Sequence, residues 1–139
     1  MPTVQKIHVE GSATTANAAV AARKVALPPL PVNGAWSING QILAVDPAVG
    51  ATRNQVQFNM AASGISIAGI ATETDGVGPS AWPTQPAVNL FTSTVVTLVL
   101  NPGSPTVSPT AELEFTGPTL EGPPASADWF WELDVTLAT

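Results

Sequence analysis

The sequence predicts an all-β protein: a single jelly-roll-like antiparallel β-sandwich preceded by an N-terminal arm. Hydrophobic residues recur at every second position in most segments, which is the spacing of a strand with one buried face. Fourteen prolines and 11 glycines interrupt these segments, as in strands joined by turns. The 139 residues fit one domain. We divide it into an arm, residues 1–10, and a sandwich of about eight strands, residues 11–139.

The C-terminal segment, WFWELDVTLA, is the clearest strand. Alternation places tryptophans and aliphatic residues on one face and mostly polar residues on the other. The expected inward residues are Trp129, Trp131, Leu133, Val135 and Leu137. The segment AELEF alternates likewise, so Ala111, Leu113 and Phe115 are expected to point inward.

Residues 35–61 predict a strand, a loop and a returning strand. WSINGQILA and QVQFNM both alternate, and the DPAVGATRN between them supplies Asp, Pro and Gly at turn positions. The alanine-rich segment 13–24 fits either a helix or a strand by composition. We favour a strand, because it lacks an apolar stripe at helical spacing and lies between Gly11 and the LPPLP of residues 27–31.

The segment VVTLVL, residues 95–100, is apolar on both faces. One face of a sandwich strand meets the core, so we expect the other face to meet a second subunit. The N-terminal arm and a tryptophan in a proline-rich loop are also expected at subunit contacts. The predicted interface residues are Val4, Ile7, Val9, Trp82, Val96, Leu98 and Leu100, with the opposite parity open for the last three.

Composition argues against several classes of function. The chain has no cysteine and one histidine, His8, and it carries no glycine-rich phosphate motif. We therefore expect no enzyme activity and no cofactor or metal. Residues 25–139 carry nine acids and a single Arg or Lys, Arg53, which disfavours nucleic acid as a partner. No apolar run is long enough for a membrane span or a secretory signal, so no membrane partner is expected.

Four carboxylates are expected on outward faces of two strands: Glu112, Glu114, Glu132 and Asp134. Three interpretations are open. The carboxylates are staggered and solvated, they bind calcium, or they pair with cations. For the last interpretation the candidate partners are Lys6, Arg23 and Lys24 of a neighbouring subunit, or a basic surface of another protein.

The tryptophans offer two interpretations. Trp36, Trp129 and Trp131 share their parity with core residues, which favours a core role over sugar binding. Trp82 lies in GPSAWPTQP, where a subunit interface is favoured over a glycan site.

The order of these segments resembles the small jelly-roll modules of tailed-phage virion proteins. The resemblance rests on GSATT at residues 11–15, WSINGQILAV at 36–45, VQFNM at 56–60, LEFTG at 113–117 and WFWEL at 129–133. Such modules are commonly trimeric. They lie on capsids as decoration proteins or at the ends of fibres and tails. Many of them carry basic residues after the first hairpin strand, where this chain has Asp46.

The resemblance implies a phage virion structural protein, made in the host cytoplasm and placed on the outer capsid surface. The expected role is a capsid decoration (cement) protein that stabilises the shell. Its expected partners are copies of itself, as a homotrimer, and the major capsid protein or another virion protein. The alternatives are a tail or fibre-tip structural or receptor-binding protein and, from another class, a carbohydrate-binding β-sandwich module.

Overall fold

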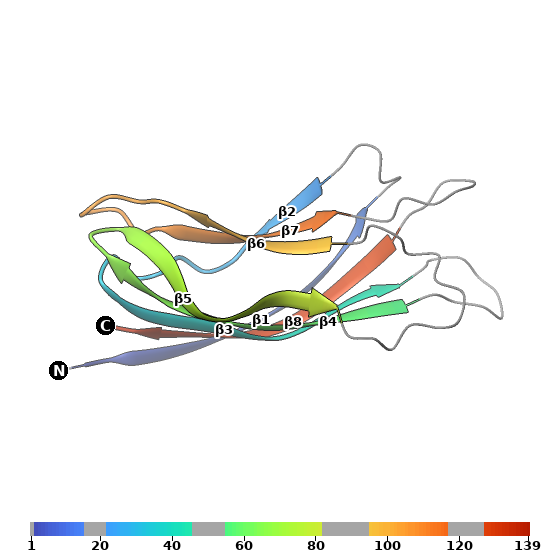
Figure 1. Cartoon of the computed structure of the whole chain (residues 1–139), viewed down its shortest axis with the longest axis horizontal. Coiled ribbons are helices and arrows are strands. Elements are labelled where there is room, and N and C mark those ends of the chain that lie inside the picture. The colour runs from blue at the N-terminus through green and yellow to red at the C-terminus, as the bar shows by residue number, and fades with distance from the viewer. Residues whose placement is uncertain (1, 16–21, 46–54, 82–94, 117–126) are drawn as a thin grey trace.

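A computed structural model describes residues 2–15, 22–45, 55–81, 95–116 and 127–139. Its described elements are strands, arranged in two antiparallel sheets that pack face to face as a β-sandwich (Figure 1). The predicted fold class is confirmed. The strands are β1 (Val4–Thr15), β2 (Ala22–Ala26), β3 (Gly34–Val45), β4 (Gln55–Ile67), β5 (Ile70–Ala81), β6 (Val95–Asn101), β7 (Thr110–Thr116) and β8 (Ala127–Ala138).

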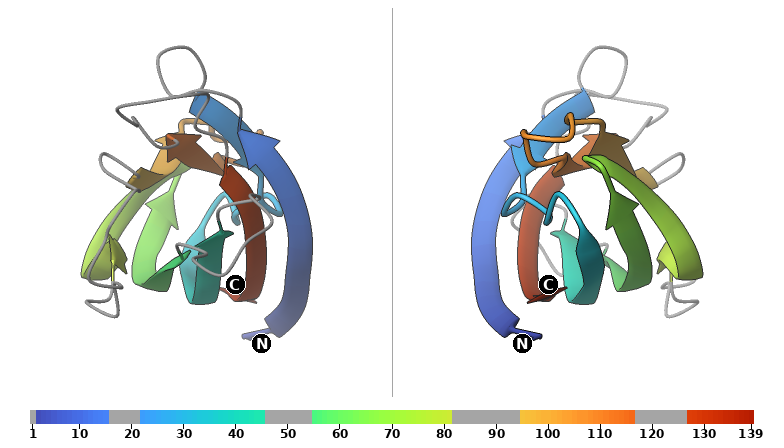
Figure 2. Two further views of the ribbon diagram at one scale, coloured as in Figure 1. Left: turned by 90° about the vertical axis from the view of Figure 1, so that its right-hand side faces the viewer. Right: turned by 90° about the vertical axis from the view of Figure 1, so that its left-hand side faces the viewer.

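The larger sheet has the order β1-β8-β3-β4-β5 and the smaller sheet the order β2-β7-β6. Figure 2 shows the larger sheet as a curved row beneath the smaller one. Strands β3, β4 and β5 follow one another, and β8 returns beside β3, which is a Greek key. In a jelly roll the first strand pairs with the last and the second strand with the one before the last. Both pairs, β1·β8 and β2·β7, are present here. This nesting does not continue, because β3 pairs with β4.

The period-two pattern fixes the core. The inward residues predicted on the last strand are buried or packed against the core, and Ala111, Leu113 and Phe115 are fully buried. The core role predicted for the three tryptophans is also confirmed, because Trp36, Trp129 and Trp131 all belong to the core cluster. Strands flank residues 16–21 of the ambiguous alanine-rich segment, and those six residues lie outside the described part.

An aromatic stack joins the two sheets. Phe115 of β7 stacks on Trp129 of β8 with ring centroids 4.7 Å apart, and it lies 5.3 Å from the ring of Trp131. Phe58 of β4 stacks on Trp129 at 6.0 Å. Offset aromatic pairs at such distances each add about 0.5–1.5 kcal/mol beyond the burial of their area. The stack therefore fixes how the smaller sheet sits on the larger one.

Two core tryptophans lie directly opposite glycines on neighbouring strands. Trp131 pairs with Gly11 of β1, and Trp36 pairs with Gly64 of β4. A methyl group on Gly11 would lie 2.7 Å from Cε2 of Trp131, and one on Gly64 would lie 2.8 Å from Cε2 of Trp36. Each glycine leaves the space that the facing indole occupies.

The predicted N-terminal arm is not a separate element. β1 runs through the proposed boundary at residues 10 and 11 and pairs with β8 over its whole length, from Val4 to Thr15. Thr3 and Thr139 exchange backbone hydrogen bonds of 2.9 and 3.0 Å, which ties the two ends of the chain together. Ile7 and Val9 pack against the core, so only Val4 of the three arm residues is exposed. Alternation on a sheet strand, with one face on the core, explains the difference.

The parity chosen for the apolar strand β6 is wrong. Val96 is buried in the core, and Leu98 and Leu100 pack against it. The opposite face carries Thr97, which is exposed, and Val99, which is half-buried. Because both faces of β6 carry apolar residues, the sequence did not indicate which face meets the core.

The β4–β5 turn is braced at the end of the sandwich that carries both termini (Figure 2, right). Ala68 and Gly69 both have positive φ, 51° and 80°. Asn33 Oδ1 accepts a 2.9 Å hydrogen bond from the Ala68 N–H, and Val32 O accepts one from Gly69. Gly69 O in turn accepts a 2.7 Å hydrogen bond from Gly103, beyond β6. This turn is thus held by loops from both sides.

We predict that Gly11→Ala lowers the free energy of unfolding by about 1–3 kcal/mol, because the added methyl group overlaps the Trp131 indole and forces the stack to shift. Chemical denaturation followed by tryptophan fluorescence measures this. The control is Ser12→Ala on the exposed face of the same strand, which should change stability by less than about 0.5 kcal/mol. Equal stability of Gly11→Ala and the wild type would show that the indole is not confined by β1.

Candidate functional site

The register of the larger sheet brings distant residues together on its outer face. One row across the sheet contains Glu10, Glu132 and Gln41, and the next row contains Ser12, Phe130 and Leu43. Gln57 of β4 lies beside Leu43. These side chains come from four strands, and the apolar pair Phe130 and Leu43 lies next to the polar row.

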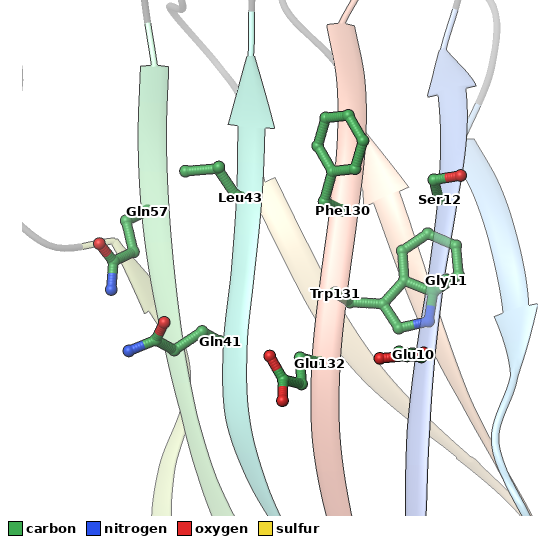
Figure 3. A pocket seen from close by; sticks show the side chains of 9 residues that line it. All are labelled: Glu10, Gly11, Ser12, Gln41, Leu43, Gln57, Phe130, Trp131 and Glu132. Atoms are coloured by element: carbon green, nitrogen blue, oxygen red, sulfur yellow. The ribbon is translucent and has the colours of Figure 1, made fainter.

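These two rows line a shallow hollow of about 520 Å³, which we call the Phe130 hollow (Figure 3). Phe130 is 47% exposed even though it lies on β8, inside the sheet rather than at its edge. Figure 3 shows Phe130 and Leu43 on one side of the hollow and Gln41 and Glu132 on the other. The lining residues are Glu10, Gly11, Ser12, Gln41, Leu43, Gln57, Phe130, Trp131 and Glu132.

His8 lies among three carboxylates beside this hollow. Its Nδ1 is 2.8 Å from Oδ1 of Asp134, the residue opposite on β8. Its Nε2 is 3.5 Å from Glu10 and 3.6 Å from Glu132. Glu10 and Glu132 face each other across the β1–β8 ladder, where like charges are destabilising. When it is protonated, the imidazole therefore offsets a repulsion between the two strands.

The hydrogen bond to Asp134 is the main reason that the pKa of His8 is raised above 6.5, with Glu10 and Glu132 adding to the effect. The imidazole is thus more readily protonated than a free histidine. All four side chains are largely exposed to solvent, which screens these interactions.

A second surface lies near the chain ends, at the end of the larger sheet. Its outermost row consists of Val4, Ala138, Ala35 and Ile65, which are neighbours on four successive strands. Ile67 and Ile70 continue it at the β4–β5 turn, where they pair with each other. Val4 and Ile67 are each 64% exposed and Ile70 is 51% exposed. We call these six residues the apolar end band.

Two of the residues named for charge pairing, Lys24 and Glu114, lie close to each other within the chain, and pairing with a neighbouring subunit stays a prediction. Lys24 Nζ lies 3.9 Å from Glu114, its cross-strand neighbour. Glu112 accepts a 2.8 Å hydrogen bond from Asn101 Nδ2. Lys6 is exposed opposite Thr136, and the side chain of Arg23 lies outside the described part.

The two pairs of carboxylates belong to different sheets. Glu112 and Glu114 are on β7, whereas Glu132 and Asp134 are on β8, so they do not face each other across a ladder. Glu132 instead faces Glu10 across the β1–β8 ladder. Sequence reasoning missed the cluster around His8, because Glu10 and Asp134 meet only through the pairing of the first strand with the last.

Trp82 lies outside the described residues, as does any contact it makes. Among the described residues, no group of three or more His, Cys, Asp or Glu has the arrangement of a metal site. The same residues contain no helix that is long and apolar enough to cross a membrane.

The exposed Phe130 carries a signal that was readable in the sequence. It occupies an outward position of a strand whose other outward residues are mostly polar, between two inward tryptophans.

The chain matches no protein-family model, no curated protein and no solved structure.

We predict that His8 titrates above pH 6.5 in the folded protein. A pKa raised by folding means that the protonated form stabilises the β1–β8 pair below pH 6.5, and that this contribution is lost as the pH rises through the folded-state pKa. As the single histidine, His8 gives one imidazole Hε1 resonance in NMR. Asp134→Asn should move the midpoint down toward 6.5, and an unchanged midpoint would contradict the role of Asp134.

Proposed function

We propose that this chain is a structural protein of a phage virion, and that it decorates and stabilises the capsid from outside. The observation that carries the proposal is the apolar end band. It presents isoleucines to solvent on a turn held by hydrogen bonds from residues 32, 33 and 103. Exposed apolar groups on a rigid support are typical of docking surfaces.

The chemistry of the band suits a permanent contact. Burying an aliphatic side chain contributes about 1.5–3 kcal/mol, and the band has no charged side chain whose desolvation would oppose this gain. Charged residues make up only 10% of the chain, which is consistent with a protein that is permanently bound in an assembly. The proposed partners are the major shell protein and further copies of this chain, as trimers.

We infer a capsid protein as the partner because the order of the strand segments resembles that of tailed-phage jelly-roll modules. A tail or fibre-tip role would use the same surface on a different virion protein. The two roles differ in copy number rather than in the chemistry of the contact.

We predict that Ile67→Ser combined with Ile70→Ser weakens binding to particles by at least tenfold, because both side chains would lose their buried contacts. The assay adds purified chain to particles made without it and measures the bound fraction after sedimentation.

The control is Asn39→Ala, an exposed residue of β3 that belongs to neither the end band nor the Phe130 hollow. It should leave binding unchanged. Full binding by the double variant, or loss of binding by Asn39→Ala alone, would place the contact away from the end band. Circular dichroism and thermal melting establish that each variant is folded.

A further inference from the structure

We propose that the Phe130 hollow binds a neutral saccharide. A pyranose ring would lie with its aliphatic face against Phe130 and Leu43. Its hydroxyl groups would exchange hydrogen bonds with the amides of Gln41 and Gln57 and donate to the carboxylate of Glu132. This site is separate from the apolar end band and goes beyond the proposed role in the capsid.

The first argument is the exposed aromatic ring. Trp129 and Trp131 fill the core, so alternation turns residue 130 outward, but nothing in that geometry requires it to be a phenylalanine. Its neighbours along the outer face of β8 are Asp128 and Glu132. An apolar ring among polar groups, next to Leu43, provides the flat surface that the C–H face of a sugar ring packs against.

The second argument is the set of hydrogen-bonding groups around the ring. Gln41 is exposed and Gln57 half-buried, and neither amide makes a hydrogen bond to another described residue. Each amide offers both a donor and an acceptor, and Ser12 adds a hydroxyl at the other side. A polyhydroxylated ligand can use all of these groups.

The third argument is charge, which selects among ligands. Glu10 and Glu132 both line the hollow, so sulfated, phosphorylated or carboxylated sugars would be repelled. A basic peptide is the competing occupant. It is less favoured, because both carboxylates already lie within 3.6 Å of His8 Nε2 and because the amide N–H groups have no use for a cation.

The size of the hollow agrees with such a ligand. Its volume of about 520 Å³ lies within the usual range of roughly 300–1,000 Å³ for small-molecule sites. Because it is shallow, we expect weak binding, with a dissociation constant on the order of 1 mM for a single sugar unit. Repeated copies on one particle would raise the effective affinity.

The test uses the isolated full-length chain. A broad glycan array identifies candidate sugars, which are then titrated into labelled protein while NMR follows the side-chain amides of Gln41 and Gln57 and the ring of Phe130. We expect saturable shifts at these three residues with at least one neutral sugar, and none with glucuronate. Phe130→Ala should weaken binding at least tenfold, whereas Phe130→Trp should preserve it.

The control is Val99→Ser on β6 of the smaller sheet, away from the hollow, which should bind as the wild type does. Absence of saturable binding by any neutral glycan would overturn the proposal, as would equal binding by Phe130→Ala. Binding of an arginine-containing peptide at the same residues, with no sugar response, would assign the hollow to a basic partner instead. None of these outcomes depends on whether the chain binds a capsid.

Discussion

The stacking of Phe115 against Trp129 and Trp131 is the interaction on which the other features depend. It is the place where the smaller sheet contributes a ring to the larger one, at centroid distances of 4.7 and 5.3 Å. In a chain with no cysteine, packing of this kind takes the place of covalent cross-links. The stack also requires space on the neighbouring strand, which explains why a glycine, Gly11, lies opposite Trp131.

The same stack determines what reaches the surface. With Trp129 and Trp131 committed to the core, the residue between them faces outward and forms the centre of a hollow. Pairing of β8 with β1 and β3 then sets Glu10, Glu132 and Gln41 in one row beside it. The apolar end band lies along another row of the same sheet face. Two surfaces of different chemistry thus share one sheet.

Strand positions and inward faces were predictable wherever one face alone was apolar, as in Trp129–Leu137 and Ala111–Phe115. Prediction failed for β6, because Val95–Leu100 is apolar on both faces and only the packing of the sheets selects Val96. It failed for the arm, because nothing local shows that residues 4–15 pair with residues 127–138. The His8 cluster and the Phe130 hollow depend on that same long-range register, which is why their individual residues gave no sign of belonging together.

Under the proposed function, this chain is a repeated part of a particle and docks through the apolar end band. The most direct test is quantitative mass spectrometry of density-purified particles, which gives the ratio of this chain to the most abundant shell protein. For a decoration protein we expect a copy number comparable to that of the shell protein. A handful of copies per particle would point to a tail or fibre, and complete absence from particles would contradict the structural role.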